Sequence, residues 1–82
     1  METTIMALAI DHRVAKAAEI QTILTKYGCI IKTRLGLHEA NQDSCSERGL
    51  IILHVSSDAK EVEKLEKDLN VVEGVKVKYM TL

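Results

Sequence analysis

Arginine and glycine stand close together at two places in this chain. Arg34 lies two residues before Gly36, and Arg48 directly precedes Gly49. Glycine lets another molecule approach the main chain closely, and an arginine guanidinium can hold a carboxylate or phosphate through two parallel hydrogen bonds. The two pairs therefore predict a site for a small anion. The competing interpretation is that both arginines are solvated charges protecting the edge of a sheet.

A further polar group, Asp11-His12-Arg13, follows the first apolar run of the chain. At the start of a helix these residues would add backbone N–H groups to an anion site. Asp11 has a simpler alternative role as the cap of that helix. The predicted effector-binding set is Asp11, His12, Arg13, Arg34, Gly36 and Arg48.

Imidazole and thiolate groups form a second candidate site. His38, Cys45 and His54 occur within one stretch of the chain. With His12 they offer ligands that suit zinc, nickel or copper. Their spacing matches no standard metal motif, so the alternative is that His54 faces solvent or an interface. Cys29, the other cysteine, is expected to be a small buried hydrophobe.

Signatures of catalysis and of nucleic-acid binding are missing from the sequence. It contains no phosphate-binding glycine-rich loop, no Ser-His-Asp grouping, no paired-carboxylate motif and no Cys-x-x-Cys. The apolar runs that would form central strands hold no aromatic residue on which RNA bases could stack. We therefore expect a protein that is not an enzyme, needs no cofactor and makes no direct contact with nucleic acid.

Length and charge limit the function classes further. The 82 residues carry 11 basic and 12 acidic side chains, so the net charge of −1 attracts neither nucleic acid nor an anionic membrane. No apolar run approaches the roughly 18 residues of a membrane span, and the first residues are polar and acidic rather than basic as in a secretion signal. We expect one domain over residues 1–82, in the cytoplasm and without membrane contact.

Hydrophobic periodicity predicts the elements that must position these residues. Continuous apolar runs at 3–10 and 49–56 predict strands buried on both faces, whereas 29–38 and 75–79 alternate and predict strands with one polar face. A polar loop at 39–48 would link the two middle strands.

Two amphipathic helices complete the pattern. Asp11 is expected to cap the first helix and Gly28 to end it. Asp58 and Glu61 resemble a capping pair for the second helix. The apolar stripes consist of Val14, Ala17, Ala18, Ile20, Leu24 and Tyr27 in the first helix, and of Val62, Leu65, Leu69 and Val72 in the second.

The order strand, helix, strand, strand, helix, strand has one right-handed solution at this size. It is an α+β, ferredoxin-like βαββαβ two-layer sandwich with antiparallel sheet order 4-1-3-2. Both helices would cover one face of the sheet, yet the central strands are apolar on both sides. The open face therefore predicts a homo-oligomer, a dimer or tetramer, assembled through this face or the edge strands. The alternative is an open face whose small side chains tolerate solvent.

Several short segments together resemble a known family. They are 8–14 (LAIDHRV), 23–28 (ILTKYG), 31–37 (IKTRLGL), 48–52 (RGLII), and Leu69 followed by 72–77 (VEGVKV). Over nearly the whole chain they are similar to the regulators of the iron-only hydrogenase system, which are small ACT-like proteins. The same architecture forms the metal-binding C-terminal domain of nickel-responsive repressors. The resemblance implies a sensing oligomer with a role in hydrogenase expression or maturation.

ACT-like domains bind a small effector, often an amino acid, near the loop after the first strand and a partner subunit. The amino-acid-binding loops usually contain glycine, which residues 10–13 lack. We therefore expect an oligomeric ACT-like regulatory domain that binds a small anionic or amino-acid-like effector between the first helix, the hairpin and a neighbouring subunit. A transition-metal-binding protein and a ligand-free assembly module that contacts a partner protein are the alternatives.

Overall fold

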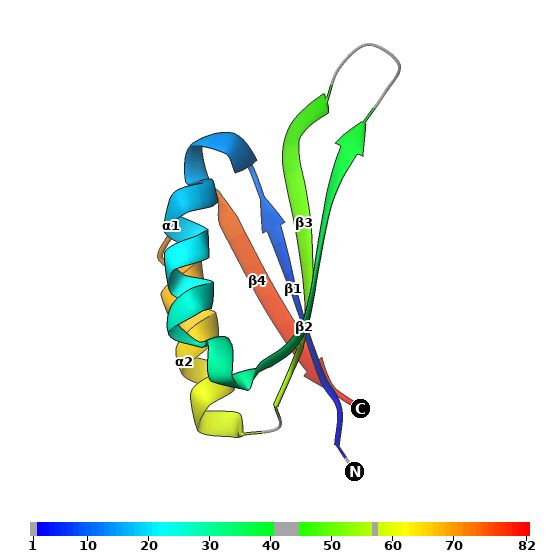
Figure 1. The fold of residues 1–82 in the computed structure, drawn as a ribbon, viewed down its shortest axis with the longest axis vertical. Coiled ribbons are helices and arrows are strands. Elements are labelled where there is room, and N and C mark those ends of the chain that lie inside the picture. The colour runs from blue at the N-terminus through cyan, green and yellow to red at the C-terminus, as the bar shows by residue number, and fades with distance from the viewer. Residues whose placement is uncertain (1, 41–44, 57) are drawn as a thin grey trace.

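Two helices pack against one face of a four-stranded antiparallel sheet (Figure 1). The structure is a computed structural model that describes residues 2–40, 45–56 and 58–82, and the side chains of these residues other than 13, 37–40 and 45–47. The sheet order β2-β3-β1-β4 is the predicted order 4-1-3-2 viewed from the other edge, so the predicted α+β ferredoxin-like fold is confirmed. The elements are β1 (Thr4–Ile10), α1 (Arg13–Lys26), the short 3₁₀ helix η1 (Gly28–Ile30), β2 (Ile31–Ala40), β3 (Cys45–Val55), α2 (Ala59–Asn70) and β4 (Val75–Thr81).

The core lies between the sheet and the helices. On β1, Met6, Leu8 and Ile10 point toward the helices and are at most 4% exposed. Burial of each such side chain stabilises the fold by about 1.5–3 kcal/mol. The remaining buried apolar residues are Ile20, Leu24, Tyr27, Ile51, Leu53, Val55, Val62, Leu65, Leu69, Val72, Val75 and Val77.

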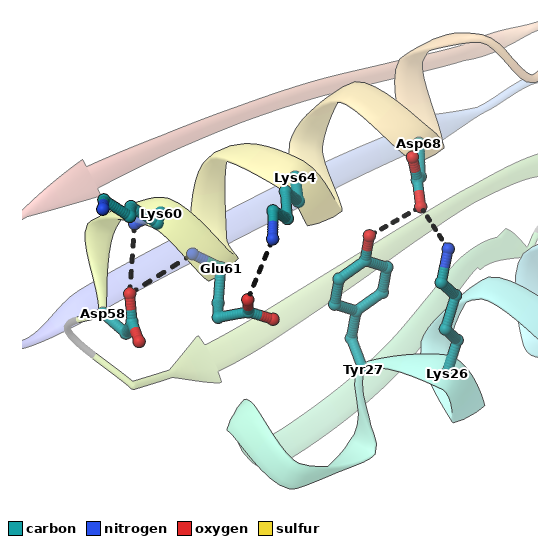
Figure 2. A network of polar contacts seen from close by, with 7 residues as sticks. All are labelled: Lys26, Tyr27, Asp58, Lys60, Glu61, Lys64 and Asp68. Carbon is teal, nitrogen blue, oxygen red and sulfur yellow. Dashed lines mark hydrogen bonds and ion pairs between the residues drawn. The ribbon is translucent and has the colours of Figure 1, made fainter.

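Helix α2 follows the prediction at its capped start and along its buried face, but it ends at Asn70 with Val71 as its C-cap, so Val72 lies just beyond it. One Asp58 carboxylate oxygen accepts hydrogen bonds from the backbone N–H groups of Lys60, at 3.1 Å, and Glu61, at 3.3 Å (Figure 2). The predicted stripe of Val62, Leu65, Leu69 and Val72 is buried. Gly74, in the turn that follows, has φ +82°, a conformation that favours glycine.

Helix α1 departs from the prediction at its start. Its N-cap is His12, in a left-handed conformation with φ 53° and without a side-chain cap hydrogen bond, so the predicted cap at Asp11 is wrong. The Asp11 N–H donates to the Gly74 carbonyl at 2.8 Å. This bond ties Asp11 to the turn before β4, and the left-handed conformation of His12 places the start of the helix at Arg13.

The first half of α1 also lies off the core. Val14 is 66% exposed, and Ala17 and Ala18 are exposed too, which contradicts their predicted place on a buried stripe. Burial begins at Ile20 and continues at Leu24. Short alanine side chains cannot reach the sheet, so a gap opens beneath this half of the helix.

The end of α1 is tied to α2. The helix ends at Lys26 with Tyr27 as its C-cap, and Gly28 opens η1 rather than ending the helix itself. The Tyr27 hydroxyl donates to the Asp68 carboxylate at 2.7 Å, and the Lys26 ammonium lies 3.3 Å from the same oxygen (Figure 2). Cys29 is exposed, because it falls in η1 outside the core, so its predicted burial is wrong.

The β2–β3 hairpin is longer than its polar sequence indicates. Strand pairing reaches Ala40 and Cys45, so both ends of the predicted loop at 39–48 belong to strands. Main-chain pairing requires no apolar side chains, which explains the error. Residues 41–44 of that loop lie outside the described residues. The hairpin extends past the ends of both helices (Figure 1).

On the face of the sheet opposite the helices, the central strands β1 and β3 present mainly apolar side chains, as predicted. Leu35 and Met80 are 52% and 57% exposed, at its two edges. Lys76 and Lys78 lie on this face too, since they pair with Ala9 and Ala7. The described apolar residues of this open face are Ile5, Ala7, Ala9, Leu35, Leu50, Ile52 and Met80, and Thr33 and His54 lie on the same face.

Candidate functional site

A cavity of about 480 Å³ lies between α1 and the β2–β3 hairpin. Its volume falls within the range of about 300–1,000 Å³ that is typical of small-molecule sites. We call it the α1–β2 cleft. Its described lining residues are Ile10, Ala17, Ala18, Ile20, Gln21, Arg34, Gly36, Gly49, Leu50 and Ile51.

Small residues on both walls create the α1–β2 cleft. Ala17 and Ala18 form the helix wall, and Gly36 lies on the strand wall opposite. Gly36 pairs with Ile51, whose side chain is buried toward the helices, so a side chain at position 36 would point to that same face. A Cβ atom there would meet no atom within 4 Å. The absence of side chains at this position is therefore what leaves the cleft open.

Arg34 supplies the only charged side chain among the described residues that line the α1–β2 cleft. Its Nη1 donates to Oε1 of Gln21 at 2.6 Å. The Gln21 Nε2 in turn donates to the Thr25 hydroxyl at 3.2 Å, which fixes the orientation of the amide. A chain of two hydrogen bonds thus links the guanidinium to α1.

The six residues of the predicted effector site divide between two places. Arg34 and Gly36 line the α1–β2 cleft. Asp11 and His12 line a separate hollow of about 500 Å³, which they share with Ala15, Lys16, Glu73 and Gly74.

Arg48 joins the second of these places. Its Nε lies 3.6 Å from Oδ1 of Asp11, in an exposed ion pair. The side chain of Arg13 lies outside the described set, although its backbone starts α1. The structure therefore does not gather the predicted residues into one site.

Of the three predicted metal ligands, His54 lies far along the hairpin from His38 and Cys45. His38 pairs with Gly49, and Cys45 pairs with Ala40 near the same end. His54 lies five positions beyond Gly49 on β3, which corresponds to roughly 16 Å along a strand. The side chains of His38 and Cys45 lie outside the described set. Among the described residues, no group of three or more His, Cys, Asp or Glu could hold a metal ion.

Sequence reasoning missed Gln21 as a site residue. Its signal was weak, because an exposed glutamine in the middle of a helix is ordinary. The alanines at 17 and 18 were a better clue, since they occupy positions of the predicted apolar stripe where larger side chains would fill the space above the sheet.

The contact of Lys26 and Tyr27 with Asp68 lies outside the α1–β2 cleft. Its pKa shifts are those of a contact that holds the two helices together. The hydrogen bond from the Tyr27 hydroxyl to the Asp68 carboxylate is the main cause that raises the pKa of Tyr27 to about 12. The same hydrogen bond is the main cause that lowers the pKa of Asp68 below its ordinary value. Both shifts favour the neutral phenol paired with the ionised carboxylate over the middle of the pH range.

The same arrangement of helices and strands occurs in solved structures. An uncharacterized protein from Thermotoga maritima superposes with a TM-score of 0.81 at 19% sequence identity, over 100% of this chain and 99% of that one. CPII, a nitrogen regulatory PII-like protein from Thiomonas intermedia that was solved with ADP, AMP and bicarbonate, superposes with a TM-score of 0.68 at 12% identity, over 100% and 91% of the two chains. At these identities the likeness shows the fold.

Neither sequence comparison adds a family. A scan of protein-family models finds none that matches this chain. A search of curated proteins also finds no match. The structure itself adds one limit, since neither α1 nor α2 in the described ranges has the length and apolar character needed to cross a lipid bilayer.

Proposed function

We propose that this chain is a single ACT-like regulatory domain that performs no catalysis and binds a small anionic effector in the α1–β2 cleft. The observation that carries the proposal is Arg34, which Gln21 holds beside a cavity whose other described walls are mainly apolar. An arginine in that position supplies charge-assisted hydrogen bonds to an anion, and the apolar walls offer contacts to the rest of the ligand.

The resemblance noted in the sequence supplies a finer part of the proposal. It connects the effector with the expression or maturation of an iron-only hydrogenase. CPII, with the same fold, was solved with ADP, AMP and bicarbonate, so small anions are ligands of at least one protein of this architecture. A role in sensing a small ligand fits both the family resemblance of the sequence and the fold shared with CPII.

The open face supports self-association as a second part of the proposal. It presents Leu35 and Met80, each more than half exposed, beside Ile5 and Ile52. A contiguous apolar face of this kind marks an interaction surface on most proteins. We expect a second copy of the chain to cover it. An assembly module that contacts another protein through this face is the second candidate function.

A thermal-shift experiment tests the proposal for the ligand. A ligand that binds only the folded state, present at ten times its Kd, adds about 1.4 kcal/mol of stability and raises the Tm of a domain of this size by about 6–11 °C. We expect such a rise with at least one small anion, and its loss in Arg34→Gln. The matched control is Lys32→Gln, which removes an exposed charge from the same strand outside the cleft.

Either of two results would contradict the proposal. One is a Tm that no small anion raises. The other is a rise that Lys32→Gln abolishes as fully as Arg34→Gln does, because the effect would then follow net charge rather than the cleft.

A further inference from the structure

We infer that the ligand of the α1–β2 cleft is a monocarboxylate with a compact aliphatic body, and that Gln21 is the positioning residue that aims Arg34 at its carboxylate. This inference rests on the proposed function and narrows it to one ligand class. It follows from the charge of the described lining residues, from the edge of the guanidinium that Gln21 leaves unbonded, and from the nature of the walls.

The hydrogen bond to Gln21 divides the guanidinium into a held side and a free side. Nη1 is engaged with Gln21 at 2.6 Å, and Arg34 makes no other hydrogen bond or ion pair within the described part of the chain. A guanidinium has five N–H groups in a rigid fork. The Nε and Nη2 edge therefore remains available for a bidentate carboxylate.

The walls beside Arg34 suit a hydrocarbon body. Ile10, Ile20 and Ile51 line the cleft together with Ala17 and Ala18. Each of the three isoleucines is at most 9% exposed, so they form a fixed floor of packed core, and the exposed Ala17 and Ala18 offer the more accessible apolar surface. A branched alkyl group would bury its surface against them at about 25 cal/mol per Å².

The charge of the described lining residues suits one negative charge. Arg34 carries a single positive charge, and the described lining residues include no lysine and no second arginine. A phosphate monoester carries about −1.5 to −2 at pH 7, so AMP would leave charge uncompensated beside apolar walls and ADP would leave more.

The same lining argues against recognition of an ammonium group. None of the described lining residues carries a carboxylate, and the Gln21 oxygen is already occupied by Arg34. An α-amino acid would therefore lose hydration of its ammonium without gaining a side-chain acceptor. The free acid should bind more tightly than the amino acid with the same carbon skeleton.

Titration calorimetry of the full chain with five probes tests the ligand class. The probes are 4-methylpentanoate, its primary amide, leucine, AMP and ADP. We expect saturable binding of the acid, and at least about tenfold weaker binding of the amide, because the amide forfeits the charge-assisted hydrogen bonds. Leucine, AMP and ADP should also bind at least about tenfold more weakly than the acid.

Three results would overturn the inference. Tighter binding of AMP or ADP that depends on Arg34, or tighter binding of leucine, would leave the proposed function standing and exclude the monocarboxylate class. No binding of any probe, together with no Tm rise from any small anion, would remove both the inference and the proposed function.

Two variants test the site and the role of Gln21. Gly36→Ile places a β-branched side chain in the cleft at a position where a Cβ meets nothing within 4 Å, so it should abolish binding of the acid while the Tm without ligand holds or rises. Gln21→Met removes the oxygen that holds Arg34 without adding a charge, and it should lower the affinity for the acid by about tenfold or more while the affinity for the amide stays unchanged.

The ratio of acid to amide affinity is the decisive readout for Gln21. If Gln21 had only a structural role, its substitution would lower the affinities for the acid and the amide alike. The ratio of the two affinities would then stay as in the wild type. Glu19→Gln, an exposed change on α1 outside the cleft, is the control and should preserve both affinities. An unchanged ratio in Gln21→Met would show that Gln21 does not position Arg34.

Discussion

The two helices cover the same face of the sheet but differ in how they are held there. Helix α2 has a capped start at Asp58 and a fully buried stripe that includes Leu65 and Leu69. Helix α1 has His12 as an N-cap without a side-chain bond, and no described side chain is buried before Ile20.

The difference separates stability from function along the chain. All of α2 is anchored by its side chains, whereas α1 is anchored only from Ile20 to the Tyr27 hydrogen bond with Asp68. The first half of α1, before Ile20, has no described side chain buried in the core, and the space between it and the sheet is the α1–β2 cleft. We call this segment the raised half of α1. A helix that packed along its full length would stabilise the sheet more and leave no room for a ligand.

The largest expected effect comes from the buried face of α2. Leu65 is 0% exposed, so Leu65→Ala removes packed methyl groups and leaves a cavity. We expect a loss of about 2–5 kcal/mol in the free energy of unfolding, measured by urea denaturation. Val71→Ala, at a position that is 83% exposed, is the control. A loss below 1 kcal/mol for Leu65→Ala, on the same scale, would contradict the anchoring of α2.

The next effect compares the starts of the two helices. Asp58→Ala removes a carboxylate that accepts two backbone hydrogen bonds and should destabilise the protein by about 1 kcal/mol. Asp11→Ala removes only an exposed ion pair with Arg48, so its effect should stay below about 0.5 kcal/mol. Equal losses in the two variants would mean that Asp11 acts as a cap in solution.

The contact between the helix ends should give a smaller effect that depends on pH. Tyr27→Phe removes the hydrogen bond to Asp68 and should lower the Tm at neutral pH. The folded state lowers the pKa of Asp68 below its ordinary 3.8, so that stabilisation is present above pH 3.8 and is lost as pH falls through the folded pKa. The folded state also raises the pKa of Tyr27 from 10.0 to about 12. The stabilisation from Tyr27 is therefore present below pH 10 and is lost as pH rises through about 12.

The wild type and Tyr27→Phe should therefore differ most between these limits and converge in acid. Titration of the Asp68 carboxyl by NMR should show its pKa rising toward 3.8 in the variant. Tyr79→Phe, on the exposed part of β4, should change neither the Tm nor that pKa. A Tm difference that stays constant down to acid pH would contradict the role of this hydrogen bond.

The smallest effect is expected on the raised half of α1. Val14 is 66% exposed, so Val14→Ala removes no packed group. Alanine has the higher helix propensity, and the variant should be unchanged or more stable by about 0.5 kcal/mol. A loss comparable to that of Leu65→Ala would mean that this half of α1 packs against the sheet after all.

The same contrast explains which features the sequence alone could predict. Helix α2 was predictable because local signals agree there: the Asp58 cap, the spacing of Val62, Leu65 and Leu69, and the glycine at 74. On α1 the pattern misled, since Val14 and the alanines fit an apolar stripe by spacing. Whether a stripe is buried depends on the tertiary position of the helix, which spacing alone does not encode.

The candidate site was predictable only in part for a related reason. Arg34 and Gly36 stood out because their types carry chemistry and both belong to one strand. Their separation from Asp11 and Arg48 depends on the backbone bond between Asp11 and Gly74 and on the length of the hairpin. Neither is visible in residue types, and Gln21 gains its role only because the fold brings α1 beside β2.

An NMR titration tests most directly the claim that the raised half of α1 forms a binding site. The ¹⁵N-labelled protein would be titrated with 4-methylpentanoate while its backbone amide signals are followed. We predict saturable shifts at Ala17, Ala18, Gly36 and Gly49, and unchanged amides in the buried stripe of α2. Shifts confined to α2, or no saturable shift anywhere, would contradict the account.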